Sequence, residues 1–285
     1  MKARLFILSL CCAIAAVSCQ KEEKTKEPTK GPVTITLSRD DIGTKTTLTT
    51  SGAGLNRVWS ASDKVSVIDA YGNNEMFTLV SGAGTATATF SNASSVYATG
   101  THGIRVIYPY TNTKDGYNWW IRSMENQGTG SLANLGNYDF LYREGSIVDG
   151  IYTSGGTFNS QSTFFKIPSG IKFLNTTGSS TIETMVLEET ANKMGYRARN
   201  NSNSNSAAVD NGSVTLENIP LTDGALTQDV FISFIYRSTP DYNFNLKIKL
   251  VGNATIYTFP LMTSEYLTNN HIYNFTQAKF TPKDI

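Results

Sequence analysis

Cysteine is almost missing from this chain, and the few that occur lie at its start. The 285 residues contain 3 Cys, at Cys11, Cys12 and Cys19. Beyond Cys19 there is no thiol, which excludes disulfides, thiolate metal sites and a cysteine nucleophile from the rest of the chain. Histidine is also scarce, because only His102 and His271 occur, and neither an HExxH nor a GxSxG motif is present. The sequence therefore predicts no cofactor, no metal site and no enzymatic activity.

Charge is low as well. Asp, Glu, Lys and Arg make up 16% of the residues, against roughly 25% in ordinary soluble proteins. The 24 Lys plus Arg nearly balance the 23 Asp plus Glu, so there is no basic excess to attract nucleic acid. Thr, Ser, Asn and Gly are abundant instead, and the 14 Tyr and 14 Phe favour strands. This composition predicts an extracellular all-β protein.

No apolar run is long enough to cross a membrane. The longest extends from Leu5 to Val17, whereas a spanning helix needs about 20 residues. Two basic residues precede it and small residues follow, which predicts a secretory signal peptide over residues 1–18. The sequence AVSC at 16–19 resembles a bacterial lipobox, although alanine stands at 16 where leucine is usual. The resemblance implies a lipoprotein whose Cys19 carries acyl chains, such as palmitate, that insert into outer-membrane lipid.

The residues directly after this cysteine are mostly charged. Gln20, Lys21, Glu22 and Glu23 resemble the export signal that Gram-negative anaerobes of the gut and mouth place after the lipid cysteine. The resemblance implies a location on the outer face of the cell outer membrane. The polar composition up to Gly31 predicts a flexible tether over residues 19–31.

After the tether, apolar and polar side chains alternate, which is the pattern of a strand with one buried face. We expect strands at 33–37, 65–67, 86–90 and 104–108, and then at 164–167, 171–174, 182–187, 214–216, 230–236 and 242–250. Turn signals such as GAG at 82–84 separate them, and only residues 130–141 leave room for a helical turn. The spacing predicts β-sandwiches rather than a βαβ fold. We place the boundary between two units at residue 150, which gives domains 32–150 and 151–285.

Several segments together resemble the fimbrillin-like family, the pilins and pilin-related surface lipoproteins of the same anaerobes. They are KTTL at 45–48, VWSASDKVSVID at 58–69, FTLVSGAGTATATF at 77–90, VIYPY at 106–110, YDFLY at 138–142 and NNHIYNFT at 269–276. Trp59 and Asp63 match family positions, whereas Ser62 replaces a usual glycine. The resemblance implies two tandem transthyretin-like Greek-key β-sandwich domains and a role in fimbriae and adhesion, as shaft, anchor or tip subunit. It also implies other pilin subunits, and a host protein or glycan, as partners.

Polymerising members of this family exchange strands between subunits, and the resemblance implies the same mechanism for this chain. A protease removes the first strand after a basic residue, and a C-terminal strand of a neighbouring subunit fills the groove. Val33, Ile35 and Leu37 predict such a first strand, because burying three side chains of this size contributes about 5 to 8 kcal/mol.

The basic residues available for the cut are Arg39, directly after this strand, Lys45 and Arg57. At the other end, residues 272–280 are apolar but break the alternation. They predict a bulged closing strand rather than a free donor strand.

An enzyme that hydrolyses glycans is the first competing function. Its two carboxylates must face one cleft. The adjacent pairs Asp40–Asp41 and Glu188–Glu189 point to opposite faces of a strand, so neither pair meets this requirement.

A glycan-binding module of a polysaccharide-uptake system is the second competing function. Its contacts are predicted at Tyr117, Trp119 and Trp120, because the first two share one face of a strand and the third lies on the other. Packing of these aromatic side chains in a core is the alternative interpretation.

Overall fold

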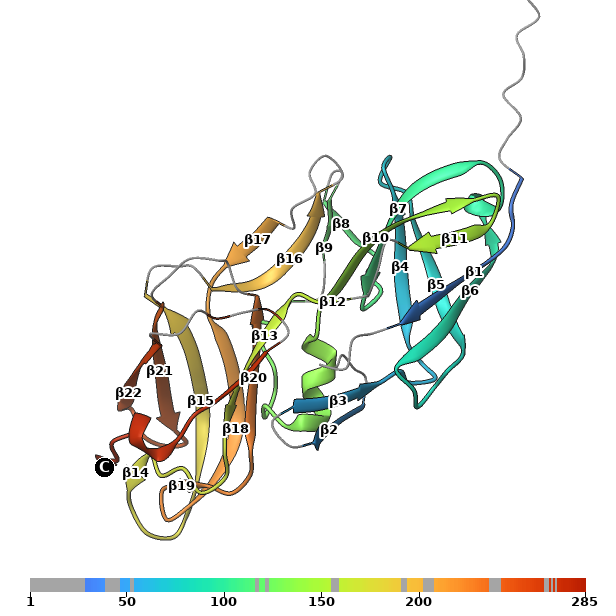
Figure 1. Cartoon of the computed structure of the whole chain (residues 1–285). Coiled ribbons are helices and arrows are strands. Elements are labelled where there is room, and N and C mark those ends of the chain that lie inside the picture. The colour runs from blue at the N-terminus through green and yellow to red at the C-terminus, as the bar shows by residue number, and fades with distance from the viewer. Residues whose placement is uncertain are drawn as a thin grey trace, which may run out of the picture.

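The computed structural model of the chain describes residues 29–38, 47–51, 54–115, 118–120, 123–154, 159–190, 194–201, 208–235, 242–263, 267, 269 and 271–285. Strands dominate these residues, so the expected all-β class is confirmed (Figure 1). The helical turn expected within 130–141 is α1 (Leu132–Leu135). In the described part of the chain, no helix is long and apolar enough to cross a membrane.

The first sheet closes on itself. Its spatial order is β11 (Ile151–Ser154), β1 (Gly31–Ser38), β6 (Thr87–Ser95), β5 (Asn74–Ser81), β4 (Lys64–Asp69), β7 (Thr101–Tyr108), β10 (Leu141–Val148) and β12 (Asn159–Ser160). Strand β11 also pairs with β10, so all of these strands except β12 form a ring, which we call the barrel. Neighbours in the ring are antiparallel except for β1 and β11, which run parallel.

Alternate side chains of these strands fill the barrel. The buried cluster consists of Val33, Ile35, Leu37, Trp59, Val65, Val67, Phe77, Ala88, Phe90, Tyr97, Ile104, Val106, Tyr108, Leu141 and Ile147. The Trp59 ring packs edge-on against Phe90 and Tyr108, with ring centroids 4.8 Å and 5.4 Å away. The sequence pattern at 33–37, 65–67 and 104–108 therefore predicted correctly which side chains face a core.

Two further sheets pack face to face beside the barrel (Figure 1). One has the order β19 (Ala225–Leu226), β18 (Val214–Thr222), β15 (Ser179–Glu189), β21 (Tyr242–Leu250) and β22 (Ile256–Thr263). The other has the order β23 (Ile272–Asn274), β13 (Ser162–Ile167), β20 (Val230–Ile235), β16 (Gly195–Asn201), β9 (Asn118–Trp120) and β8 (Thr113–Asp115), with β17 (Ala208–Asn211) on β16. Phe165 of one sheet lies 5.1 Å from Phe244 of the other, measured between ring centroids, so one core joins both.

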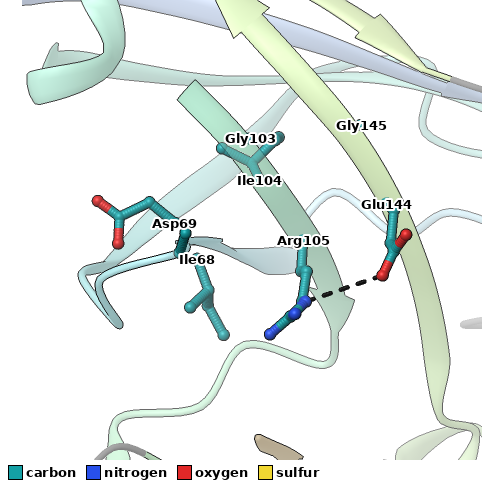
Figure 2. Close-up of a pocket in the computed structure, with 8 residues that line it drawn as sticks. Ile68, Asp69, Gly103, Ile104, Arg105, Glu144 and Gly145 are labelled. Atoms are coloured by element: carbon teal, nitrogen blue, oxygen red, sulfur yellow. Dashed lines mark ion pairs between the residues drawn. The ribbon is translucent and has the colours of Figure 1, made fainter. Parts of the chain in front are cut away.

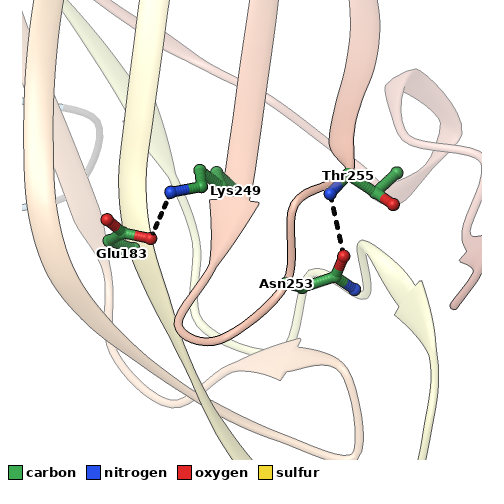
Figure 3. A network of polar contacts seen from close by, with 4 residues as sticks. All are labelled: Glu183, Lys249, Asn253 and Thr255. Atoms are coloured by element: carbon green, nitrogen blue, oxygen red, sulfur yellow. Dashed lines mark hydrogen bonds and ion pairs between the residues drawn. The ribbon is translucent and has the colours of Figure 1, made fainter.

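The outer face of β15 and β21 is polar. Lys249 Nζ lies 2.7 Å from Glu183 Oε2, and the Thr255 amide donates to Asn253 Oδ1 at 2.8 Å in the turn beyond β21 (Figure 3). On the opposite face, Phe244 and Leu246 are buried. The alternation at 242–250 thus separates a buried face from a solvent-exposed face, as expected.

A connecting segment, residues 123–140, covers the outer face of β13 and β20. Leu135 of α1 packs with Phe164 and Phe231, which point away from the main core. Met124 and Phe140 of the same segment pack with Ile68 and Ile107 from the barrel and with Ile235 of β20. The connecting segment therefore joins the barrel to the paired sheets through buried apolar contacts.

The prediction of a strand over residues 171–174 is wrong. Lys172 makes an isolated bridge with Ala225, and the two-residue β14 (Leu174–Asn175) pairs with β24 (Lys283–Asp284) near the C-terminus. The preceding Gly170 has a φ of 84°, which turns the chain before a ladder can form. The apolar run at this position reflects burial of Ile171 and Phe173 rather than strand pairing.

Residue 150 lies in the turn between β10 and β11, and both strands belong to the barrel. Asp149 and Gly150 supply this turn with φ values of 46° and 78°. Strands β8 and β9 precede this turn in the sequence but extend the sheet that contains β16. The division into domains 32–150 and 151–285 stays a prediction.

An ion pair at the end of β13 and β20 leads to a pH-dependent prediction. Lys166 Nζ lies 2.7 Å from Asp229 Oδ2, and the Ser169 amide donates to Asp229 Oδ1 at 2.8 Å. Burial opposes the charge on Asp229, but these hydrogen bonds outweigh it and lower the pKa of the carboxyl. A lowered pKa stabilises the fold above the unfolded-state value of about 3.9, and this stabilisation is lost as the pH falls through the folded-state value.

We expect Asp229→Asn to lower the free energy of unfolding at pH 7 by up to about 1 kcal/mol, because the pair is partly exposed. The difference from the wild type should shrink as the pH falls below about 4. Urea denaturation at a series of pH values measures it. A difference that stays constant across that range would show that the carboxylate charge does not matter.

Candidate functional site

The candidate site is the groove of the barrel that β1 occupies. Along one edge, β1 pairs with β6 in an antiparallel ladder from Val33↔Asn92 to Ser38↔Thr87. Along the other edge, Thr34↔Ile151 is the registered pair between β1 and β11. The pairing that closes the barrel is therefore extensive on the β6 side and short on the β11 side.

The two faces of β1 have opposite character. Val33, Ile35 and Leu37 are at most 2% exposed and belong to the barrel core, whereas Thr34, Thr36 and Ser38 are exposed. The Thr36 and Thr89 hydroxyls lie 3.2 Å apart on the outer face. Strand β1 is thus the first strand in the described part of the chain, alternates without a break from Val33 onward, and fills a groove that is apolar inside and polar outside.

The side of β1 that faces β11 is the weaker boundary of this groove. Ile151 is 71% exposed although it lies opposite Thr34, and Val148, its partner across the hairpin, is 42% exposed. Apolar side chains at the tip of a hairpin are available to a neighbouring chain. The β11 side is therefore where the barrel presents both short strand pairing and exposed apolar surface.

Several predicted site residues lie outside the described residues. They are Cys19, Gln20, Lys21, Glu22, Glu23, Arg39, Lys45, Asp40, Asp41 and Tyr117. Arg57 lies in β3 (Gly54–Val58), whose backbone pairs with β2 (Thr47–Ser51), but its side chain is also outside the description. The lipid site, the export signal and the cleavage sites stay predictions.

The aromatic pair proposed for glycan contact lies on β9. The backbone of Trp119 pairs with Lys114 on one side and with Asn200 on the other, and Trp120 pairs with Thr113 and Arg199. Neighbouring residues of a strand point to opposite faces. Because their side chains lie outside the description, a sugar site at these residues stays a prediction.

The remaining residues considered for catalysis or metal binding do not gather at one site. Glu188 forms an ion pair with Lys247 on the outer face, whereas Glu189 is 5% exposed on the opposite face, as the alternation predicts. His102 Nε2 lies 2.9 Å from the Thr99 carbonyl oxygen, and His271 is exposed. Within the described ranges, no cluster of His, Cys, Asp and Glu is arranged to hold a metal ion.

A hollow of about 220 Å³ on the outer face of β4, β7 and β10 was not foreseen from the sequence (Figure 2). Its lining includes Arg105 and Glu144, whose Nε and Oε1 atoms are 3.9 Å apart. The Tyr142 hydroxyl donates to Glu144 Oε1 at 2.8 Å, and burial, followed by this carboxylate, raises the pKa of Tyr142 to about 12. Arg105 and Glu144 meet only through the register of β7 and β10, which no local sequence pattern reveals.

Comparison with known proteins gives distant structural matches. No protein-family model matches the chain, and no curated protein matches it. A "putative cell adhesion protein" of Bacteroides ovatus is 13% identical over 77% of this chain and 84% of its own length, with a TM-score of 0.43. A protein of the same name from Bacteroides fragilis is 14% identical over 87% and 90% of the two chains, with a TM-score of 0.40.

The tip fimbrial protein Mfa3 from Porphyromonas gingivalis, with a C-terminal truncation, is also similar to this chain. It is 14% identical over 83% of both chains, with a TM-score of 0.37. These matched structures are thus of two proteins described as putative cell adhesion proteins and of a tip fimbrial protein.

Proposed function

We propose that this chain is a fimbrillin-like surface lipoprotein that acts in fimbrial assembly or cell adhesion and catalyses no reaction. In this proposal the barrel and the paired sheets correspond to two tandem transthyretin-like Greek-key domains. The observation that carries it is the position of β1, an N-terminal strand whose three buried side chains, Val33, Ile35 and Leu37, complete the barrel core. Such a strand has the properties that strand exchange between subunits requires.

The energetics of exchange follow from the same three side chains. Removing them from the core forfeits about 5 to 8 kcal/mol, which is much of a domain's typical stability of about 5 to 15 kcal/mol. An open groove is therefore too unstable to persist. An incoming strand with apolar residues at alternate positions restores both the ladder to β6 and the core contacts.

The C-terminal segment is the proposed source of a donor strand, and here it is held within its own subunit. Ile272–Asn274 pairs with β13 as a parallel edge strand, and Phe275 and Phe280 after it are 6% and 1% exposed. A donor role requires these contacts to be released. The arrangement therefore favours a subunit that receives a strand before it donates one.

The proposed location rests on the sequence. Acylation of Cys19 anchors the chain in outer-membrane lipid, and the tether over residues 19–31 holds the barrel at the cell surface. The proposed partners are other pilin subunits and a host protein or glycan. A surface glycan-binding protein remains the alternative, with contacts at Tyr117, Trp119 and Trp120.

Electron microscopy of the purified protein before and after limited trypsin treatment tests the proposal. We expect monomers before treatment and filaments or strand-linked oligomers after cleavage at Arg39. Replacing Arg39, Lys45 and Arg57 together with glutamine should block this change, whereas Arg57→Gln alone should leave it intact. Particles that remain monomeric after complete cleavage would exclude a shaft subunit and strand exchange between copies.

A further inference from the structure

Gly103 of β7 is a glycine that the barrel itself does not require. It lies inside a strand, its φ is outside the left-handed region, and a Cβ atom at this position would meet no atom of the described residues within 4 Å. Gly145 of β10 gives the contrast, because a Cβ atom there would lie 2.7 Å from Cε2 of Tyr152. Glycine weakens a strand, and inside a strand it often marks a place where a ligand approaches the backbone.

The missing side chain at Gly103 leaves a hollow on the outer face of the barrel. Ile104 belongs to the barrel core, so Gly103 and Arg105 on either side of it face outward by alternation. The lining of this hollow of about 220 Å³ includes Ile68, Ala70, Gly103, Arg105 and Glu144 (Figure 2). Every residue of the lining lies in the described part of the chain, so the shape of the hollow is defined.

The polar wall of the hollow is a pair of opposite charges that strand pairing holds in place. Glu144 of β10 lies opposite Arg105 of β7, with 3.9 Å between Oε1 and Nε. The Tyr142 hydroxyl donates to the same Oε1 at 2.8 Å and orients the carboxylate, while the Glu144 side chain stays 51% exposed. The wall therefore offers hydrogen-bond donors and acceptors side by side.

An exposed aromatic side chain follows the lining directly in the sequence. Ala70 lines the hollow, and Tyr71 after it is 83% exposed. The turn that carries both is held by Asp69, whose Oδ1 accepts hydrogen bonds from the Tyr71 and Asn73 amides, both at 2.9 Å. A tyrosine on a fixed turn offers a partner a large ring and a hydroxyl at a low cost in conformational entropy.

These features suit a neutral sugar residue better than an ion. Each sugar hydroxyl both donates and accepts, so neighbouring hydroxyls can bind the Arg105 guanidinium and the Glu144 carboxylate together. Those two groups carry no net charge between them, and Asp69, which also lines the hollow, is acidic, so the lining has no positive excess to select an anion. The bare backbone of Gly103 lets the C–H face of a sugar ring approach closely.

We propose that the hollow at Gly103 binds a neutral sugar residue of a glycan. Arg105 and Glu144 bind its hydroxyls, and Tyr71 packs against its ring. This inference rests on the proposed adhesive role, for which it supplies a contact with a glycan partner. It involves neither the β1 groove nor the aromatic residues of β9. Sugar binding and the formation of filaments after trypsin treatment can therefore fail independently.

A ¹⁵N NMR titration of the purified protein tests the proposal, with the methyl glycosides of glucose, galactose, mannose and N-acetylglucosamine as probes. We expect at least one of them to shift the Gly103 and Arg105 amide signals saturably, with a dissociation constant of about 1 to 10 mM for a single sugar residue. Because these ligands are uncharged, the constant should be the same in about 50 mM and about 500 mM sodium chloride.

Gly103→Val should fill the hollow without a clash and raise the dissociation constant at least tenfold, followed at the Arg105 amide. Its thermal unfolding midpoint should not fall, because valine suits a strand better than glycine. Thr78→Val is the matched control, since it adds the same side chain to the outer face of β5, outside the hollow, and should bind like the wild type.

Two further variants test the contacts without filling the hollow. Arg105→Met should weaken binding roughly tenfold, because it removes hydrogen bonds from a charged group. Tyr71→Ala should weaken it about threefold, and at this exposed position it leaves the barrel core intact. The proposal would be overturned if none of the four sugars shifted these amides saturably, if the shifts vanished at high salt, or if Gly103→Val bound like the wild type.

Discussion

A chain that begins at Arg39, and therefore lacks β1, is expected to lose the cooperative unfolding of the barrel. The truncation removes Val33, Ile35 and Leu37 from the core and leaves one edge of β6 without its ladder. Exposing three side chains of this size costs about 5 to 8 kcal/mol before the hydrogen bonds are counted. Denaturant unfolding followed by tryptophan fluorescence measures it, because Trp59 lies in the same core.

A peptide that spans residues 31–38, GPVTITLS, should restore the lost transition when it is added to the truncated chain. Two variant peptides provide a matched control. Ile35→Asp places a charge in the core and should abolish the rescue, whereas Thr36→Asp changes an exposed position and should preserve most of it. A truncated chain as stable as the whole protein would show that β1 contributes little to the barrel, and the proposed function would lose its main support.

The buried faces of single strands were predictable because they depend on neighbouring residues alone. The alternation at 33–37 identifies Val33, Ile35 and Leu37 as core residues, and the alternation at 242–250 separates Phe244 and Leu246 from the wet face. In each case the pleat places every second side chain on the same face. The sequence is therefore sufficient to predict the buried face of a strand wherever one alternating segment determines it.

Features that depend on distant pairing were not predictable in this way. The parallel contact Thr34↔Ile151, which closes the barrel, joins segments more than a hundred positions apart in the sequence. The pairing of β9 with β16, which adds β8 and β9 to that sheet, joins residues such as Trp120 and Arg199 that are also far apart in the sequence. The run at 171–174 resembled a strand because its side chains are buried, although it has no extended ladder. Burial and strand pairing leave the same local pattern, so the pattern alone cannot separate them.

The same limit applies to the candidate sites. Gly103 is one glycine in a strand, and its place in the lining of the hollow is apparent only once β4, β7 and β10 pair. Arg105 and Glu144 become neighbours only through the register of β7 and β10. Cys19 could be singled out from the sequence because a cysteine directly after an apolar run has a chemical signature of its own, and its acylation stays a prediction.

Gln127 is the polar side chain that holds the connecting segment against β20. Its Nε2 donates to the Met124 carbonyl at 2.9 Å and to the Ser233 carbonyl at 2.5 Å, and its Oε1 accepts from the Ser233 amide at 2.9 Å. The side chain thus pairs with Ser233 as a neighbouring strand would. Gln127 is 1% exposed, so water cannot replace these hydrogen bonds.

Gln277 makes the same kind of contact at the surface. Its Oε1 accepts from the Lys172 amide at 2.7 Å, and its Nε2 donates to the Lys172 and Phe280 carbonyls at 2.9 Å and 2.7 Å. The residue is exposed. The two glutamines therefore have matched hydrogen bonds and opposite burial.

Gln127→Leu is expected to lower the free energy of unfolding by about 3 to 5 kcal/mol, because it leaves the Ser233 and Met124 backbone groups buried without partners. Gln277→Leu should cost at most about 1 kcal/mol, since water can bind the groups that it frees. Urea denaturation of both variants measures the difference. Because Gln127 lies on the segment that joins the barrel to the paired sheets, its loss should also separate their unfolding into two transitions. Equal costs for the two variants would mean that the number of hydrogen bonds, and not their burial, determines how firmly the connecting segment is held.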